Sequence, residues 1–138
     1  MITAVDTSVL LDIFAPDHTF GPRSRAAVRS CITEGSLVAC EVVWVEVASF
    51  FLSSEGARDA MNRLGVEFSS TDLETALAAS TSWKKYRDRG GRRDRVVADF
   101  LIGAHASLQA NRLLTRDRGF YRAYFSSLQI FDLSKTQG

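Results

Sequence analysis

Four acidic residues, spread along the chain, stand where an α/β fold could bring their side chains together. They are Asp6, Glu46, Asp99 and Asp117. Carboxylates that converge without a basic partner repel one another and take up protons, and a divalent cation removes that conflict. All-oxygen ligation suits Mg²⁺ or Mn²⁺. Such an ion can orient water, lower its pKa and neutralise charge on a phosphate, so the chemistry indicated is phosphoryl transfer to water.

Two of these acids follow predicted strands. Asp6 comes directly after the apolar run Ile2 to Val5, and Asp117 comes just after the run Arg112 to Thr115. In a parallel sheet the carboxyl ends of all strands lie at one edge, where open α/β sheets bind ligands. We therefore expect both side chains in one crevice. Asp6 also has a purely structural interpretation, as an N-cap of the helix that follows it.

A third acid, Asp99, lies in the first turn of a helix predicted over Val96 to Gln109. The N-terminus of this helix should open toward the same edge of the sheet, where the helix dipole favours negative charge. Gly103 and Ala106 follow on much the same helix face and are small enough to let it lie close to the sheet. If the helix begins earlier, Asp94 would replace Asp99.

The fourth acid, Glu46, interrupts the apolar run Val42 to Ala48. A charge in such surroundings rarely stays unpaired, because removing it from water costs several kcal/mol. The strand predicted before it, Leu37 to Cys40, would deliver the start of its helix to the same edge. The alternative is an exposed glutamate on an amphipathic helix.

The elements that must position these acids alternate between short apolar runs and helical patterns. Besides the strands and helix already given, further strands are predicted over Val66 to Phe68 and Leu128 to Phe131, and helices over Arg23 to Glu34, Glu41 to Ser53, Glu55 to Leu64, Thr71 to Tyr86 and Phe120 to Phe125. Thr71 and Glu74 form a capping-box pattern. Strands that alternate with helices indicate a parallel sheet covered on both faces.

Length and composition place limits on the kind of protein. With 138 residues, 46% of them hydrophobic and 24% charged, we expect one globular domain over residues 1–138. No apolar stretch approaches the roughly 20 residues that cross a bilayer, and no secretory signal opens the chain, so we expect a cytoplasmic protein with no membrane partner. Cys31 and Cys40 lack metal-type spacing and are expected to be reduced and inert.

Positive charge is concentrated locally, although the net charge is only +1. Seven basic residues against two acidic ones lie between Lys84 and Arg95, and further arginines surround Asp117. This pattern is typical of a solvated helix end, and equally of a patch that contacts phosphates beside the acids. The candidate phosphate-contacting residues are Arg92, Arg93, Arg95, Arg116 and Arg118. His105 is interpreted as a packing or surface residue, and Asp12 and Asp132 as solvent-facing.

Four motifs in this order resemble the PIN-domain nucleases, and most closely the VapC-type toxins of bacterial toxin–antitoxin pairs. They are Ala4-Val-Asp-Thr-Ser-Val-Leu-Leu-Asp12, Val45-Glu46-Val47, Ala98-Asp-Phe-Leu-Ile-Gly-Ala-His-Ala106 and Leu113-Leu-Thr-Arg-Asp117. The resemblance implies a PIN-like three-layer α/β domain, with a central parallel sheet of four or five short strands flanked by helices.

The resemblance also implies an activity: a Mg²⁺- or Mn²⁺-dependent endoribonuclease that cleaves RNA with a metal-activated water, forms a homodimer and is blocked by a cognate antitoxin. Exposed faces of the Trp44 and Met61 helices could supply dimer contacts. The implied metal-binding and catalytic acids are Asp6, Glu46, Asp99 and Asp117, with Thr115 and Ser8 supporting them. Ser8 stands where many relatives have Asn, and Gly119 where some have another acid, so a second metal site would be weaker or absent.

Other enzyme classes lose their main sequence signal. A haloacid-dehalogenase-like phosphatase would need an acid two places after Asp6, where Ser8 stands. A receiver domain would need an acidic pair after the first strand and a lysine ending a late strand. No glycine-rich nucleotide loop is present. The remaining alternatives are a non-catalytic RNA-binding module of the same fold and an RNA-processing nuclease without an antitoxin.

Overall fold

The centre of the molecule is a sheet of five short parallel strands. The computed structural model describes residues 1–15, 17–90 and 95–133. The strands are β1 (Ile2–Val5), β2 (Ser36–Ala39), β3 (Val66–Phe68), β4 (Arg112–Thr115) and β5 (Ile130–Asp132), and their order across the sheet is β3-β2-β1-β4-β5. The predicted parallel sheet of four or five strands is confirmed.

The central strand is β1, which has a parallel neighbour on each side. Ala4 is in register with Val38 of β2 and with Leu113 of β4. All four residues of β4 are buried, as are the last three of β1 and of β2. Strands covered on both faces need such near-continuous apolar runs. The chain runs from β1 to β2 and β3 on one side and then returns to β4 on the other side of β1. At such a switch point a crevice for ligands is expected at the carboxyl ends of the strands.

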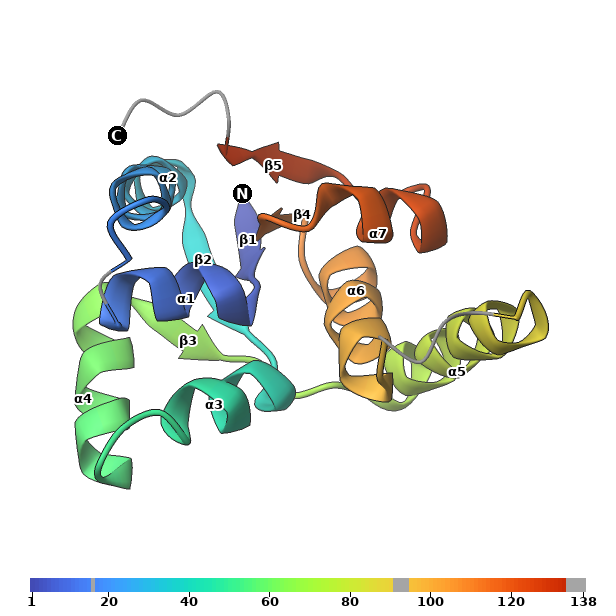
Figure 1. Ribbon diagram of the computed structural model, residues 1–138, viewed down its shortest axis with the longest axis horizontal. Coiled ribbons are helices and arrows are strands. Elements are labelled where there is room, and N and C mark those ends of the chain that lie inside the picture. The colour runs from blue at the N-terminus through green and yellow to red at the C-terminus, as the bar shows by residue number, and fades with distance from the viewer. Residues whose placement is uncertain (16, 91–94, 134–138) are drawn as a thin grey trace.

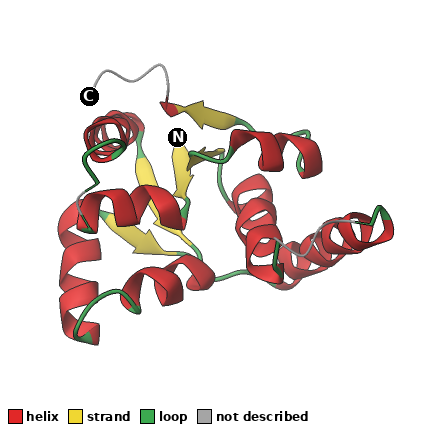
Figure 2. Cartoon of the chain, in the orientation of Figure 1, coloured by secondary structure: helices red, strands yellow, loops and turns green. Residues whose placement is uncertain are grey.

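Helices cover both faces of the sheet. They are α1 (Thr7–Phe14), α2 (Gly21–Glu34), α3 (Glu41–Ala48), α4 (Ser54–Leu64), α5 (Leu73–Asp88), α6 (Val97–Gln109) and α7 (Arg118–Tyr124). Figure 1 shows α2 and α4 on one side of the sheet and α5, α6 and α7 on the other, with α1 and α3 in front (Figure 2 separates the helices from the strands). This is the expected three-layer arrangement. No helix among the described residues is long and apolar enough to span a bilayer.

Helix ends follow local chemistry that the sequence pattern captured only in part. Gly65 ends α4 at the predicted place, in the left-handed conformation with φ 87°. The capping-box prediction was wrong by one residue, because Asp72 rather than Thr71 accepts the hydrogen bond from the Thr75 amide at 2.8 Å. The helix predicted to reach Ser53 ends at Ala48 instead.

The early end of α3 coincides with a competing hydrogen bond. The Ser49 hydroxyl donates to the Glu46 carbonyl at 2.7 Å, and two tight turns follow, with Phe50 N bonded to Val47 O and Phe51 N to Ala48 O. Hydroxyl groups that bond to nearby carbonyls offer the backbone an alternative to helix. Phe50, in this segment after α3, is an exposed apolar side chain.

Aromatic side chains fill the space between α5, α6 and α7. Phe100 is fully buried, and its ring contacts those of Trp83, Tyr86, Phe120 and Tyr124 at centroid distances of 5.2–5.6 Å. Such edge-to-face contacts stabilise beyond their buried area. This cluster fixes α6, and with it Asp99, against the helix that follows β4.

Gly103 of α6 has a different neighbour from the one expected. A Cβ atom placed on Gly103 would lie 2.3 Å from the Phe125 ring, so the small residue admits this ring rather than the sheet. The prediction that Gly103 lets the helix approach the sheet is thus corrected: what approaches the glycine is the end of α7.

Candidate active site

The four acids predicted from the sequence line one hollow at the carboxyl edge of the sheet. This hollow has a volume of about 500 Å³ and is lined by Asp6 after β1, Glu46 on α3, Asp99 on α6 and Asp117 after β4, together with Thr7, Ser8, Leu11, Ile102 and Arg116. Chain segments up to 111 residues apart thus meet at the switch point of the sheet. The structure brings all four together.

Asp6 is the most deeply placed of these acids. Only 8% of its surface is exposed, and its carboxylate accepts hydrogen bonds from the Thr115 hydroxyl at 2.7 Å and from the Thr7 amide at 2.8 Å. Burial raises the pKa of Asp6 to about 6, the two hydrogen bonds oppose this rise, and the charges of Asp117 and Asp99 add to it. Asp6 is the N-cap of α1 as well as a wall of the hollow, so its two interpretations hold together.

Each of the other three acids accepts a hydrogen bond from a neighbouring group of the protein. Glu46 accepts from the Thr7 hydroxyl at 2.7 Å, and Asp99 accepts from the Val96 amide at 3.0 Å. Asp117 forms an ion pair with Arg95, with 2.5 Å between Oδ2 and Nη1. In these positions no three acidic, histidine or cysteine side chains of the described residues lie close enough to share one ion.

The donor atoms nevertheless have the chemistry that a hard divalent cation needs. Every donor offered by the four acids, Thr7 and Ser8 is an oxygen, which suits Mg²⁺ or Mn²⁺ and not a soft metal. Burial, with a smaller contribution from the charges of Asp117 and Asp99, raises the pKa of Asp6, and a bound cation would favour its charged form. The donor atoms of these residues therefore suit such an ion. To bind it, Asp99 would release the Val96 amide and Asp117 would release Arg95.

Thr115 connects the two strand ends that carry acids. Its buried hydroxyl donates to Asp6 and accepts from the Asp117 amide at 3.0 Å. One side chain thereby links the acid after β1 to the backbone of the acid after β4. This contact is the kind of support expected of Thr115, while Ser8 lines the hollow.

Tyr121 is a residue of this site that sequence reasoning missed. It is 2% exposed, and burial followed by the charges of Asp6, Asp99 and Asp117 raises the pKa of its hydroxyl well above the usual range. The phenol therefore remains protonated and serves as a hydrogen-bond partner of Asp6. Its position on α7, four residues after Asp117, gave no polar signal in the sequence.

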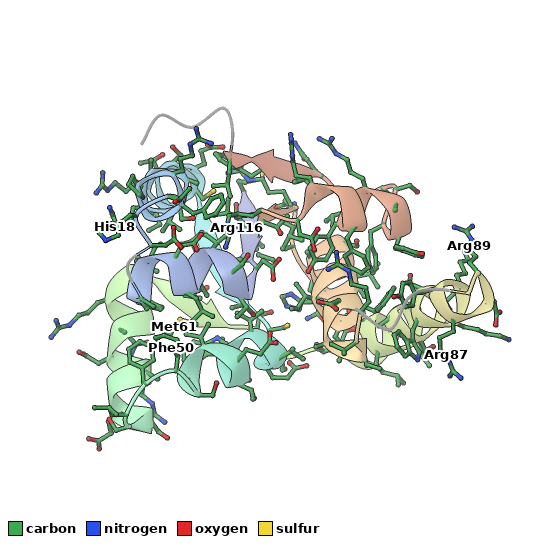
Figure 3. The ribbon with its side chains drawn as sticks, viewed as in Figure 1. His18, Phe50, Met61, Arg87, Arg89 and Arg116 are labelled. Atoms are coloured by element: carbon green, nitrogen blue, oxygen red, sulfur yellow. The ribbon has the colours of Figure 1, made fainter. Side chains whose placement is uncertain are left out.

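Asp12 was predicted to face solvent, and this prediction was wrong. It is 4% exposed and forms two hydrogen bonds with the Arg116 guanidinium, Nε at 2.9 Å and Nη2 at 3.1 Å. The Ser24 hydroxyl donates to the same carboxylate at 2.8 Å. Arg116, labelled in Figure 3, also lies 3.9 Å above the Phe20 ring. The ion pair ties α1 to the loop between Thr115 and Asp117.

The predicted basic rim is only partly in place around the acids. Arg95 and Arg116 reach the hollow, and Arg118 begins α7 beside it. Arg92 and Arg93, and the alternative ligand Asp94, lie outside the described residues. Arg87 and Arg89, at the far end of α5, are exposed and extend away from the acids in Figure 3.

Other predicted features have simple outcomes. His105 is 1% exposed and hydrogen-bonds the Ser69 hydroxyl at 2.9 Å, which confirms its packing role. Cys31 and Cys40 are buried and free. The side chain of Asp132 lies outside the described residues.

A protein-family model for the PIN domain matches residues 3–126. The chain belongs to the PIN-domain family. PIN domains are nucleases that generally use divalent metals, which agrees with the acid-lined hollow of this one. No curated protein sequence matches this PIN domain.

Solved structures support the same fold. The chain is similar to VapBC-1 from nontypeable Haemophilus influenzae, with TM-score 0.73 and 19% identity over 98% of this chain and 100% of that one. It is similar to VapBC2 from Rickettsia felis bound to a promoter DNA fragment, with TM-score 0.73 and 14% identity over 95% and 98%. FitAB bound to the IR36 DNA fragment gives TM-score 0.70 and 19% identity over 100% and 99%. At these identities the likeness concerns the fold.

Proposed function

We propose that this PIN domain is a Mg²⁺- or Mn²⁺-dependent endoribonuclease and the toxin of a toxin–antitoxin pair. The observation that supports the proposal best is the meeting of Asp6, Glu46, Asp99 and Asp117 in one hollow. The raised pKa of Asp6 adds to it, because a buried carboxylate among other carboxylates is stabilised by a bound cation.

Asp6, Asp99 and Asp117 would hold the metal ion, Glu46 would complete its surroundings, and Thr115 and Ser8 would support them. When bound, the ion lowers the pKa of water and neutralises charge on the phosphate. The chain itself orients Asp6 through Thr115 and Thr7, and the protonated Tyr121 hydroxyl gives that carboxylate a further partner. These contacts fix the carboxylate in advance, which is how a site gains precision.

The substrate is proposed to be RNA, held through its phosphates by the arginines at the rim. Arg95 is the best placed, because it already contacts Asp117 and can move from this carboxylate to a phosphate once a cation takes its place. Arg92, Arg93, Arg116 and Arg118 complete the proposed RNA-binding set.

An antitoxin partner is supported by the similar solved structures. The similar structures are VapBC and FitAB assemblies, and this chain covers nearly the whole of the matched chain in each.

A homodimer in the cytoplasm remains part of the proposal. Met61, at 0% exposure, contributes nothing to such contacts, whereas Val45 on α3 and Phe50 after it are exposed apolar side chains.

The test is cleavage of single-stranded RNA by the purified protein, with Mg²⁺ or Mn²⁺ and with EDTA. We expect cleavage only with the metals, and its loss in Asp6→Asn and Asp117→Asn. The matched control is Asp59→Asn, because Asp59 is exposed and forms an ion pair with Arg63 on α4, away from the hollow. Binding of RNA without cleavage would instead favour the non-catalytic module.

The antitoxin is tested separately, in the neighbouring genes. An adjacent gene for a small DNA-binding protein would support the antitoxin, and its absence would favour a nuclease of RNA processing.

A further inference from the structure

A second, smaller cavity lies directly beside the acid-lined hollow. It measures about 150 Å³, and three of the seven residues that line it are arginines: Arg23 at the start of α2, Arg116 and Arg118. None of its lining residues in the described part of the chain is acidic. The rest of its wall is Phe20, Ser24, Thr115 and Leu133. A cavity of this size is smaller than a site for a whole drug-sized ligand and admits a single chemical group.

The two cavities share a wall. Arg116 lines both of them, and Thr115 lines the smaller cavity while its hydroxyl donates to Asp6 in the larger one. A chain molecule that places one group among the acids would therefore place a neighbouring group among the arginines. The smaller cavity is thus suited to a repeating ligand and not to an unrelated small molecule.

The floor of the smaller cavity is fixed before any ligand arrives. Asp12, 4% exposed, holds Arg116 in a two-point contact, and the fully buried Ser24 completes the carboxylate's hydrogen bonds. Phe20 covers one face of the Arg116 guanidinium. A guanidinium held in this way loses little conformational freedom when it meets a ligand.

Arg23 supplies charge that the surrounding protein does not balance. The charge of Arg116 is neutralised by Asp12, whereas no carboxylate in the described part of the chain forms an ion pair with Arg23. A planar guanidinium favours the oxygens of phosphate, which it can contact with two parallel hydrogen bonds. The ligand chemistry indicated is a phosphodiester group.

We propose that this arginine-lined cavity binds a phosphate of the RNA strand next to the one held at the acids, with Arg23 as its principal ligand. The proposal rests on the proposed function for the identity of the strand. Arg23 thereby becomes a substrate-positioning residue that fixes which phosphate lies in the acid-lined hollow.

The experiment measures binding and cleavage separately. Binding of a short single-stranded RNA is followed by fluorescence anisotropy in EDTA over a range of salt concentrations, for the wild type, Arg23→Ala and Arg23→Lys. The matched control is Arg29→Ala, which removes the same charge from an exposed position of α2 six residues further on, about 120° around the helix. Thermal unfolding checks that each variant is folded.

We expect Arg23→Ala to weaken RNA binding about fivefold to tenfold and to reduce the slope of log affinity against log salt by about 0.7, the value for one contact to a single strand. Arg23→Lys should lie between it and the wild type, and Arg29→Ala should match the wild type. In cleavage with Mn²⁺, KM should rise by a similar factor while kcat changes little.

The outcomes separate this proposal from the nuclease itself. If the wild type cleaves RNA and Arg23→Ala behaves as Arg29→Ala does in both assays, the phosphate site is wrong and the nuclease stands. If the wild type binds RNA in an Arg23-dependent way without cleaving it, the phosphate site stands and the nuclease is wrong. A wild type that does not bind RNA overturns the phosphate site.

Discussion

The Arg95 guanidinium lies 2.5 Å from the Asp117 carboxylate and 4.2 Å above the Phe120 ring. One acid of the hollow thus has a counter-ion that belongs to the chain itself. The pair is partly exposed, with 28% of the Arg95 side chain and 40% of the Asp117 side chain accessible. A cation that uses Asp117 must compete with Arg95 for the same oxygen atoms.

Replacing Arg95 with glutamine should therefore strengthen metal binding. Ion pairs as exposed as this one contribute up to about 1 kcal/mol, so we expect the Kd for Mn²⁺ to fall about threefold to fivefold. Isothermal titration calorimetry of the RNA-free protein measures it. Arg29→Gln, which makes the same charge change away from the hollow, should leave the Kd unchanged. Equal effects of both variants would mean that only net charge matters.

Asp6 should make the metal-free protein less stable as pH rises. Its pKa is about 6 in the folded state against 3.8 ordinarily, so the folded protein binds the proton more tightly. The contribution of Asp6 is therefore most favourable below the ordinary pKa and is lost as pH rises toward about 6, by roughly 3 kcal/mol in total.

The measurement is the free energy of unfolding of the wild type minus that of Asp6→Asn, in EDTA, across this pH range. Taking the difference removes the opposite contributions of Asp17 and Asp72, whose pKa values are lowered by hydrogen bonds to backbone amides. We expect this difference to fall as pH rises, because the wild type loses stability relative to Asp6→Asn. The corresponding difference for Asp59→Asn should show no such trend. A flat difference would place Asp6 in a water-like environment.

Removing the carboxylate of Asp12 should destabilise the fold. Asp12→Ala leaves Arg116 without its partner and the Ser24 hydroxyl without its acceptor. The free energy of unfolding should fall by about 2–4 kcal/mol. This is at the low side of the loss for a fully buried ion pair, because 31% of the Arg116 side chain reaches solvent. Urea unfolding measures it, and Asp12→Asn, which keeps an acceptor oxygen, should lose less. A double-mutant cycle with Arg116→Ala isolates the pair.

An added methyl group on Gly103 should also destabilise the fold, because it would meet the Phe125 ring. Overpacking of this kind costs about 1–3 kcal/mol. Gly119→Ala is the matched control, since a Cβ there meets no atom within 4 Å. Thermal unfolding of both variants compares them. If Gly103→Ala were as stable as Gly119→Ala, the contact between α6 and the end of α7 would be looser than the structure shows.

The sequence predicted the frame of this site better than its supporting contacts. The strands Ile2–Val5, Val66–Phe68 and Arg112–Thr115 agree with the prediction to the residue. Each has apolar residues that face the core, and in the first and third most residues are buried, as is usual in a parallel sheet covered on both faces. The rule that parallel strands end at one edge was then sufficient to bring Asp6 and Asp117 together.

The burial of Asp12 and the role of Tyr121 could not be predicted in the same way. Asp12 is buried because Arg116, 104 residues further along, reaches it, and no local periodicity encodes such a pair. Tyr121 looks like any apolar residue of a short helix until α7 is placed beside Asp6. Contacts of this kind depend on tertiary packing, which residue propensities and hydrophobic patterns do not predict.

The position of β4 between β1 and β5 has a consequence for biosynthesis. The first 111 residues contain β1, β2 and β3 but leave one flank of β1 without its neighbour, Asp6 without the Thr115 hydroxyl and the hollow without Asp117. A polypeptide still emerging from the ribosome therefore lacks a finished centre until β4 has been made. Synthesis of β4 and the loop after it supplies the second neighbour of β1 and the fourth acid of the hollow.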